Sequence, residues 1–225
     1  MAIESDKIQA AVNSILATIP PGVTLLAAAK TRSLAEVEAV IAAGVTHIGY
    51  NYVQEALPII DEIGSRASWH MIGHLQRNKA KVVVENFDLV ETLDSFRLAQ
   101  ALEHFCEERQ KIMPVLLEIN SGREPNKTGL LPQDVDELVE KLNVLKYVRV
   151  QGLMTMGPLF GDPEASRPYF KTTREIYERL SKKSLPNIEM RTLSMGMSNS
   201  YRVAIEEGAN QVRLGTAIFG ARAVI

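Results

Sequence analysis

Cysteine is almost absent from this sequence, and so are long apolar runs and a net charge of either sign. Cys106 is the single cysteine among 225 residues, so no disulfide can form within the chain. That composition is typical of reducing compartments, and we expect the Cys106 thiol to be a buried apolar group rather than a reactive one. The formal net charge is −2, so no overall positive field attracts nucleic acid.

Signals for membranes and metals are missing as well. The first residues lack the basic and apolar regions of a signal peptide, and no apolar run approaches the roughly 20 residues of a membrane span. His70 and His74 have an i, i+4 spacing, but Gly73 lies between them and no further ligands stand out, so we expect no metal. The basic cluster at residues 77–81 is interpreted as a solvated helix face. A cytoplasmic protein without membrane or nucleic-acid partners is expected.

The composition is that of an ordinary globular protein. Hydrophobic residues make up 46% of the chain and charged residues 23%, which argues against disorder. A chain of this length can bury a substantial core without disulfides or metals. No repeat, low-complexity segment or linker interrupts it, so residues 1–225 are expected to form one domain.

Short apolar runs alternate with stretches of helical periodicity along the whole chain. The pattern predicts a single-domain α/β fold, a (β/α)8 TIM barrel with an extra N-terminal helix at about 4–18. An open doubly wound sheet is the alternative. Strands are expected at 23–29, 46–49, 68–72, 89–92, 113–119, 148–153, 191–194 and 211–214. Helices are expected at 34–43 after the N-cap Ser33, and at 52–64, 77–85, 95–109, 132–142, 163–182 and 200–207.

Lys30 follows the first apolar run directly. Active sites of TIM barrels gather at the C-terminal ends of the strands, which is where this lysine should lie. Partial desolvation there lowers the pKa of the amine, and a neutral amine is what Schiff-base formation with an aldehyde requires. The alternative is a lysine whose stem packs on apolar surface while its ammonium reaches solvent.

Two loops rich in serine, threonine and glycine follow the seventh and eighth expected strands. A glycine turn beside a helix N-terminus is a good anion site, and TIM barrels often bind phosphate between these two loops. The sequence therefore predicts a phosphate site at residues 193–198 and 215–220.

Arginine and histidine residues supply further candidates near the strand ends. Arg213 lies in the eighth expected strand, where it either points into the barrel toward a ring nitrogen or carboxylate or forms an ion pair on the outer face. His74, beyond the third strand, is better placed to contact a ligand than His70, which we expect to be packed and hydrogen-bonded.

Seven stretches in order carry a family resemblance: AAAKT (27–31), NYVQE (51–55), WHMIGHLQRNK (69–79), NKTG (126–129), GLMTMG (152–157), LSMGMS (193–198) and VRLGTAIFG (212–220). With them the chain resembles the YggS/PROSC (PLPBP) family of pyridoxal 5′-phosphate (PLP) homeostasis proteins. That family looks like the N-terminal barrel domain of alanine racemases, which belongs to the fold-type III PLP proteins.

The resemblance implies a cofactor and a set of ligands. Lys30 would hold PLP as a Schiff base, and Arg213 would face the pyridine nitrogen, which an arginine leaves unprotonated because it cannot accept a proton. Asn51 and His74 would lie near the ring, and Lys127 resembles a family lysine linked with cofactor handling. Around the phosphate the resemblance places Ser194, Gly196, Ser198, Gly215 and Thr216.

Two positions depart from the family pattern. Members commonly have glutamate where this chain has Tyr50, and often aspartate where it has Ser200. The loss of two acids changes the polarity of the pocket or surface and puts details of ligand exchange in doubt. Neither change removes Lys30 or the phosphate loops.

The resemblance favours PLP carriage and homeostasis without robust catalysis, with PLP-dependent apo-enzymes as potential partners. Alanine racemases add a β-domain, whereas this sequence ends five residues after Gly220, so a monomer is expected. Racemisation also needs an acid/base on the opposite face of PLP, for which Tyr50 is the only unusual candidate. A single-domain PLP-dependent amino-acid racemase and a phosphosugar isomerase-like barrel remain alternatives.

Overall fold

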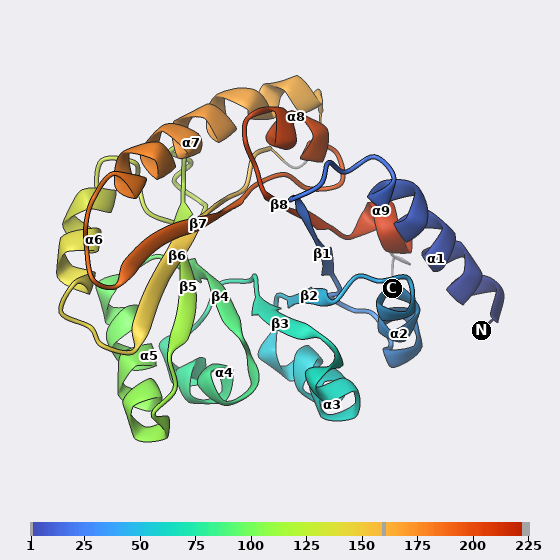
Figure 1. Cartoon of the computed structure of the whole chain (residues 1–225), viewed down its shortest axis with the longest axis horizontal. Helices are drawn as coiled ribbons and strands as arrows, with labels where there is room; N and C mark the ends of the chain where they lie inside the picture. Colours follow the sequence, from blue (N-terminus) through green and yellow to red (C-terminus); the bar gives the residue numbers. More distant parts are fainter. Residues whose placement is uncertain (1, 159–160, 222–225) are drawn as a thin grey trace.

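A closed ring of parallel strands forms the centre of the computed structural model, which describes residues 2–158 and 161–221 (Figure 1). Within these residues eight strands pair in chain order, and the last pairs with the first. The strands are β1 (Thr24–Ala28), β2 (His47–Tyr50), β3 (Ser68–Met71), β4 (Leu89–Leu93), β5 (Met113–Ile119), β6 (Val148–Thr155), β7 (Ile188–Ser194) and β8 (Gln211–Leu214). The predicted TIM barrel is confirmed, and the open sheet is excluded.

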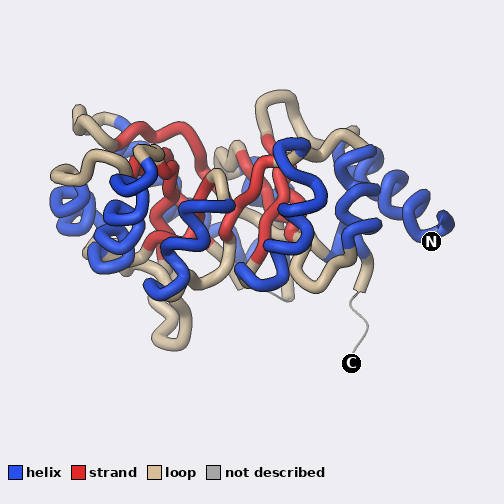
Figure 2. The backbone as a smooth tube through the Cα atoms, turned by 90° about the horizontal axis from the view of Figure 1, so that it is seen from below, coloured by secondary structure: helices blue, strands red, loops and turns tan. Residues whose placement is uncertain are grey.

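Helices surround the ring of strands (Figures 1 and 2). They are α1 (Ala2–Leu16), α2 (Leu34–Ala42), α3 (Val53–Ile63), α4 (Ala80–Asn86), α5 (Phe96–Arg109), α6 (Val135–Leu142), α7 (Arg167–Ser181), α8 (Tyr201–Glu206) and α9 (Thr216–Phe219), with short 3-10 turns at Gly64–Arg66, Arg77–Lys79 and Pro163–Ser166. The predicted extra helix is α1, which lies outside the ring against α2 and α9.

Serine residues cap the N-termini of two helices, and the Ser33 cap is as predicted. The Ser33 hydroxyl accepts a hydrogen bond from the Glu36 amide, and the Glu36 carboxylate accepts one from the Ser33 amide, which completes a capping box for α2. Ser95 caps α5 through the Leu98 amide. After α2, Gly44 adopts a φ of +93° that an L side chain would strain.

Several boundaries differ from the sequence-based expectation. Strand β7 begins at Ile188, three residues before the predicted start at 191. The prediction missed these residues because exposed Glu189 and Arg191 interrupt the apolar pattern. The predicted helix 163–182 divides into a 3-10 turn and α7, whose first turn contains Pro168. The predicted helix 77–85 likewise begins with a 3-10 turn, at Arg77–Lys79. Helix α9 was not predicted at all; its four residues are too few to show a periodicity.

The hydrophobic core lies between the barrel and the helices, where Phe87 and Phe170 are among the largest fully buried side chains. Cys106 is buried in this layer, and burial raises the pKa of its thiol to about 11, in agreement with the expected apolar role. In the described part of the chain, no helix is both long and apolar enough for a membrane crossing. Among the same residues no group of acidic, histidine or cysteine side chains is arranged for a metal ion.

Candidate functional site

A cavity of about 600 Å³ opens at the C-terminal ends of the strands. This is the end of a TIM barrel that carries ligands. Six of the nine residues predicted for the site line this cavity: Lys30, Asn51, Ser198, Arg213, Gly215 and Thr216. Apolar walls come from Ala28, Ile72, Met156 and Met197.

Lys30 lies two residues beyond β1 and is half-buried. The next residue, Thr31, has a φ of +63°, an unfavourable conformation for a β-branched side chain. Its amide donates to the Glu55 carboxylate at 3.0 Å, and the Arg32 amide donates to the Ala29 carbonyl at 3.0 Å. Backbone strain of this kind is found at functional sites, and here it turns the chain sharply after Lys30.

Asn51 follows β2 and packs against Gly73 in the loop after β3. A Cβ atom added at Gly73 would lie 2.3 Å from the Asn51 carbonyl oxygen, so no larger residue fits without moving the backbone. The Gly73 carbonyl in turn accepts a hydrogen bond from the buried Thr92 hydroxyl at 2.8 Å. Gly73 therefore allows the close approach that keeps Asn51 at the cavity wall.

The loops after β7 and β8 are joined to each other. The Ser198 hydroxyl accepts from the Ala217 amide at 3.1 Å, and the Arg213 amide donates to the Gly196 carbonyl at 3.0 Å. Gly196 has a φ of +88° and lies so close to Ala204 that a Cβ atom there would be 2.6 Å away. Gly196 thus shapes the loop from outside the cavity lining, whereas Ser198 and Thr216 face the cavity.

Ser200 closes the same loop. It is buried, and its hydroxyl accepts from the Met197 amide at 3.4 Å. Family members often have an aspartate at this position, whereas the shorter Ser200 side chain bonds within its own loop.

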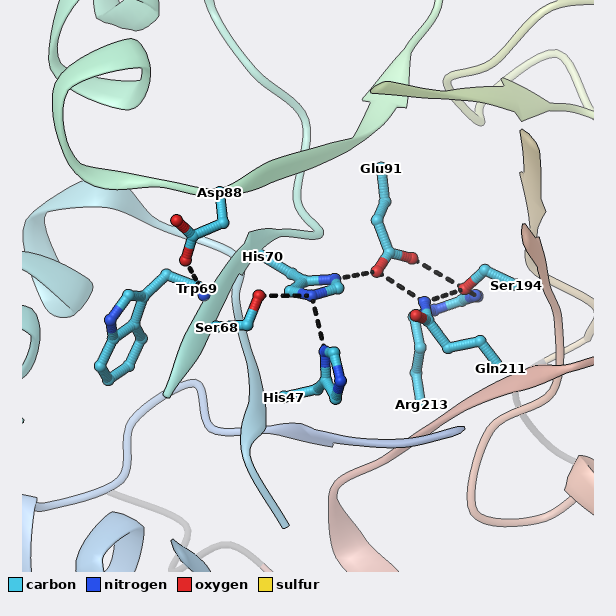
Figure 3. A network of polar contacts seen from close by, with 9 residues as sticks. All are labelled: His47, Ser68, Trp69, His70, Asp88, Glu91, Ser194, Gln211 and Arg213. Carbon is cyan, nitrogen blue, oxygen red and sulfur yellow. Dashed lines mark hydrogen bonds and ion pairs between the residues drawn. The ribbon is translucent and has the colours of Figure 1, made fainter. Parts of the chain in front are cut away.

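Ser194 lies beneath the cavity rather than in its wall. Its side chain is completely buried and donates to the Glu91 carboxylate at 2.7 Å. It accepts from Arg213 at 2.6 Å and from Gln211 at 2.9 Å (Figure 3). A hydroxyl has one proton and two lone pairs, so these bonds use its full capacity. Ser194 is expected around the phosphate, and its hydroxyl is occupied by three neighbouring polar side chains.

Arg213 points into the barrel, which excludes the alternative of an ion pair on the outer face. It is 5% exposed, and besides Ser194 its guanidinium donates to the Thr155 carbonyl at 2.8 Å. Burial lowers the pKa of Arg213, while Glu91 and Glu118 oppose that change. Arg213 therefore places a positively charged guanidinium, fixed by hydrogen bonds, at the floor of the cavity.

A network of polar side chains extends from Arg213 through Ser194 and Glu91 to His70 and His47 (Figure 3). His70 Nδ1 lies 2.7 Å from the Glu91 carboxylate, and His70 Nε2 lies 3.1 Å from His47 Nδ1. Burial raises the pKa of Glu91, but hydrogen bonding and attraction from His70, together with Arg213 and Ser194, outweigh it and hold that pKa below its usual value. The expectation of a packed, hydrogen-bonded His70 is confirmed.

The sequence-based prediction of the site missed Glu91 and Gln211. A glutamate inside the apolar run 89–93 is a visible signal, because a charge on an interior strand must find partners when it is buried. The partners themselves come from other strands and have no sequence signal.

Three other candidates lie apart from Lys30. His74 lines a neighbouring cavity, with its Nδ1 3.8 Å from the Asp94 carboxylate. Lys127 pairs with Glu124 at 2.5 Å on the loop after β5. Tyr50 is buried against Trp69, with ring centroids 6.4 Å apart, and burial raises the pKa of its hydroxyl. Tyr50 is not among the cavity-lining residues, so it is not placed as an acid/base there.

The donor set of the cavity has a clear chemical preference. Lys30 offers an amine, Arg213 a guanidinium, and Ser198 and Thr216 offer hydroxyls beside a glycine turn. An amine captures a carbonyl compound, and the remaining donors suit anionic oxygens or a ring nitrogen. A small phosphorylated carbonyl compound fits this set and the size of the cavity.

Comparison with known proteins gives consistent findings. The model of the alanine racemase N-terminal domain family matches residues 3–223. A pyridoxal phosphate homeostasis protein of Synechocystis sp. is 36% identical over 93% of this chain and 96% of its own. One of Escherichia coli is 37% identical over 96% and 93%. The structure of PipY of Synechococcus elongatus with PLP bound superposes with a TM-score of 0.86 at 32% identity, covering 95% of this chain and 100% of that one.

Proposed function

This chain belongs to the alanine racemase N-terminal domain family and, within it, to the pyridoxal phosphate homeostasis proteins, and we propose that it binds PLP as a Schiff base on Lys30. Its role is to hold the cofactor and keep it available, without robust catalysis. The observation that carries this proposal is the convergence of Lys30, Arg213 and the two loops after β7 and β8 on one cavity.

Each part of the cavity has a role in this proposal. PLP, when bound, supplies an aldehyde for the Lys30 amine and a phosphate. Ser198, Gly215 and Thr216 would hold the phosphate, while Ser194 and Gly196 would support that loop from outside the cavity lining. Asn51, which follows β2 and lines the cavity, would lie near the ring; His74 is proposed near it too, although its side chain lines the other cavity.

Arg213 favours holding the cofactor over using it. With PLP in the cavity, Arg213 would be the residue that holds the pyridine nitrogen, as a hydrogen-bond donor. Because a guanidinium cannot accept a proton, it would leave the ring uncharged and weakly electron-withdrawing. Carbanion chemistry on a substrate would therefore be poorly supported, and Tyr50, the acid/base candidate, is not among the described residues that line the cavity. We propose a monomer in the cytoplasm, with PLP-dependent apo-enzymes as recipients.

Reduction with borohydride followed by peptide mass mapping tests the binding site. The expected result is a pyridoxyl mass on the peptide that contains Lys30, lost in Lys30→Ala and retained in Lys127→Ala. Absence of the label, or a label on another lysine, would overturn the proposal. The catalytic alternative is tested by chiral chromatography after incubation with L-alanine or L-serine: sustained turnover that Lys30→Ala abolishes would replace carriage by racemisation.

A further inference from the structure

Glu91 and Ser194 form a buried support beneath Arg213. We propose that both are positioning residues that act on the cofactor through Arg213. They set how tightly the ring end of PLP is bound and the electrostatic potential around it. This inference rests on the proposed function, since it assumes that PLP occupies the cavity.

The direction of the hydrogen bonds in this support is fixed. A carboxylate only accepts, so the proton of the Ser194 hydroxyl must point at Glu91, 2.7 Å away. The lone pairs of that hydroxyl are then directed at Arg213 and Gln211, which both donate to it. Glu91 thereby determines that Ser194 acts as an acceptor for Arg213 and never as a competing donor.

Arg213 is held at two of its nitrogens by different strands. One bonds to Ser194 of β7, and the other bonds to the Thr155 carbonyl at the end of β6. The guanidinium is planar and rigid, so two fixed contacts define its plane and direct its remaining edge at the cavity that it lines. A shift of Ser194 would tilt that edge.

Charges in this part of the barrel are few and buried. Glu91 is completely buried and Arg213 is 5% exposed, with one serine hydroxyl between them (Figure 3). His70 from β3 bonds to Glu91 and to His47, and the Glu118 charge on β5 also acts on Arg213. Because screening is weak in such an interior, the Glu91 charge acts on Arg213 and on whatever Arg213 contacts.

Packing alone does not account for this arrangement. A buried ion pair is often no more stabilising than apolar side chains of the same volume. Other strands of this protein bury apolar side chains, so apolar residues could have served for packing here as well. The network ends on a residue that faces the cavity, so a role in arranging that residue explains why polar groups lie here.

Two variants separate the roles of geometry and charge. Ser194→Ala keeps the charges of Glu91 and Arg213 but removes the hydroxyl that connects them, so the Kd for PLP should rise about tenfold. Glu91→Gln removes the negative charge, and the added positive potential opposes protonation of the nitrogen that joins Lys30 to the cofactor. In absorbance spectra of the PLP-bound Glu91→Gln variant, the midpoint of the pH-dependent change should therefore lie roughly half to one pH unit below that of the unchanged protein. Titration of the apoprotein with PLP and absorbance spectra against pH measure both effects.

A double-mutant cycle tests whether Ser194 acts through Arg213. Ser194→Ala in the background of Arg213→Lys should leave the Kd where Arg213→Lys alone puts it. Thr173→Ala is the matched control, since it removes a buried hydroxyl that bonds to Tyr169 in α7; it should leave Kd and spectrum unchanged.

The outcomes distinguish this inference from the proposed function. If the unchanged protein carries no PLP on Lys30, the proposed function fails. If it does, but Ser194→Ala binds PLP as tightly as the unchanged protein, or its effect adds fully to that of Arg213→Lys, the inference alone is overturned. Failure of both Ser194→Ala and Glu91→Gln to fold would assign the network to the fold and likewise overturn it.

Discussion

The Thr31 amide donates to the Glu55 carboxylate at 3.0 Å, and this bond joins the turn after Lys30 to the first turn of α3. Thr31 has an unfavourable φ of +63°, so its conformation must be stabilised by neighbours. Glu55 is the neighbour that satisfies its amide. The direction in which the chain leaves Lys30 thus depends on a residue 24 positions away.

Glu55→Ala should therefore weaken PLP binding more than it weakens the fold. The strained turn loses a charge-assisted hydrogen bond, which typically contributes about 1.5–3 kcal/mol, and Lys30 then samples other orientations. We expect a Kd for PLP raised about tenfold or more in titrations of the apoprotein. Glu62→Ala, an exposed change on the same helix, is the control. Equal Kd values for the two variants would contradict the role assigned to Glu55.

Gly73→Ala should destabilise the protein through a steric clash. The added Cβ would lie 2.3 Å from the Asn51 carbonyl oxygen and 2.6 Å from the Asn51 Cα, both of them backbone atoms that cannot turn away. We expect a loss of about 2–4 kcal/mol in the free energy of unfolding by urea, together with weaker PLP binding. Gly44→Ala, which meets no atom within 4 Å and is strained only by its φ, should cost about 1 kcal/mol. A smaller loss for Gly73→Ala than for Gly44→Ala would show that the two loops separate easily.

Most of the barrel could be predicted because its signals are local. Apolar runs mark the strands, the Ser33 cap begins α2, and Gly44 follows its end. The start of β7 could not be found in the same way, because exposed charges on its outer face hide the run. The positions of the loops after β7 and β8 are local as well, since Ser198 and Thr216 follow these strands and both line the cavity.

The network that Arg213 joins could not be predicted, because it depends on register between strands. Glu91, Ser194 and Gln211 are far apart in the sequence, and they meet only because β7 and β8 pair Ser194 with Gln211 inside a closed barrel. Ser194, in the motif at 193–198, is expected around the phosphate. No signal in the sequence indicates that its hydroxyl bonds to Glu91, Gln211 and Arg213 inside the barrel.

Cys106 should resist thiol reagents in the folded protein. It is completely buried, and burial raises the pKa of its thiol to about 11, so at pH 8 little of the reactive thiolate is present. We expect slow labelling by a maleimide in buffer and rapid, stoichiometric labelling in urea, followed by mass spectrometry. Rapid labelling without denaturant would show that α5 opens readily or that the thiol is activated.

His47 should make the fold less stable in mild acid. Burial, with the nearby His70 second, lowers the pKa of His47 in the folded protein below 6.5. The unfolded chain then binds more protons than the folded one between these two pKa values, so stability is complete above pH 6.5 and is lost as the pH falls toward the folded pKa. Glu91 and Asp88 act in the opposite direction on His47, but they do not reverse it. Urea unfolding at several values between pH 5 and 7.5 should show the midpoint concentration falling with acidity, and His47→Asn should flatten that dependence. His104→Gln, on the exposed face of α5, should leave the dependence intact. A slope equally steep in His47→Asn and the unchanged protein would mean that another group takes up the proton on unfolding.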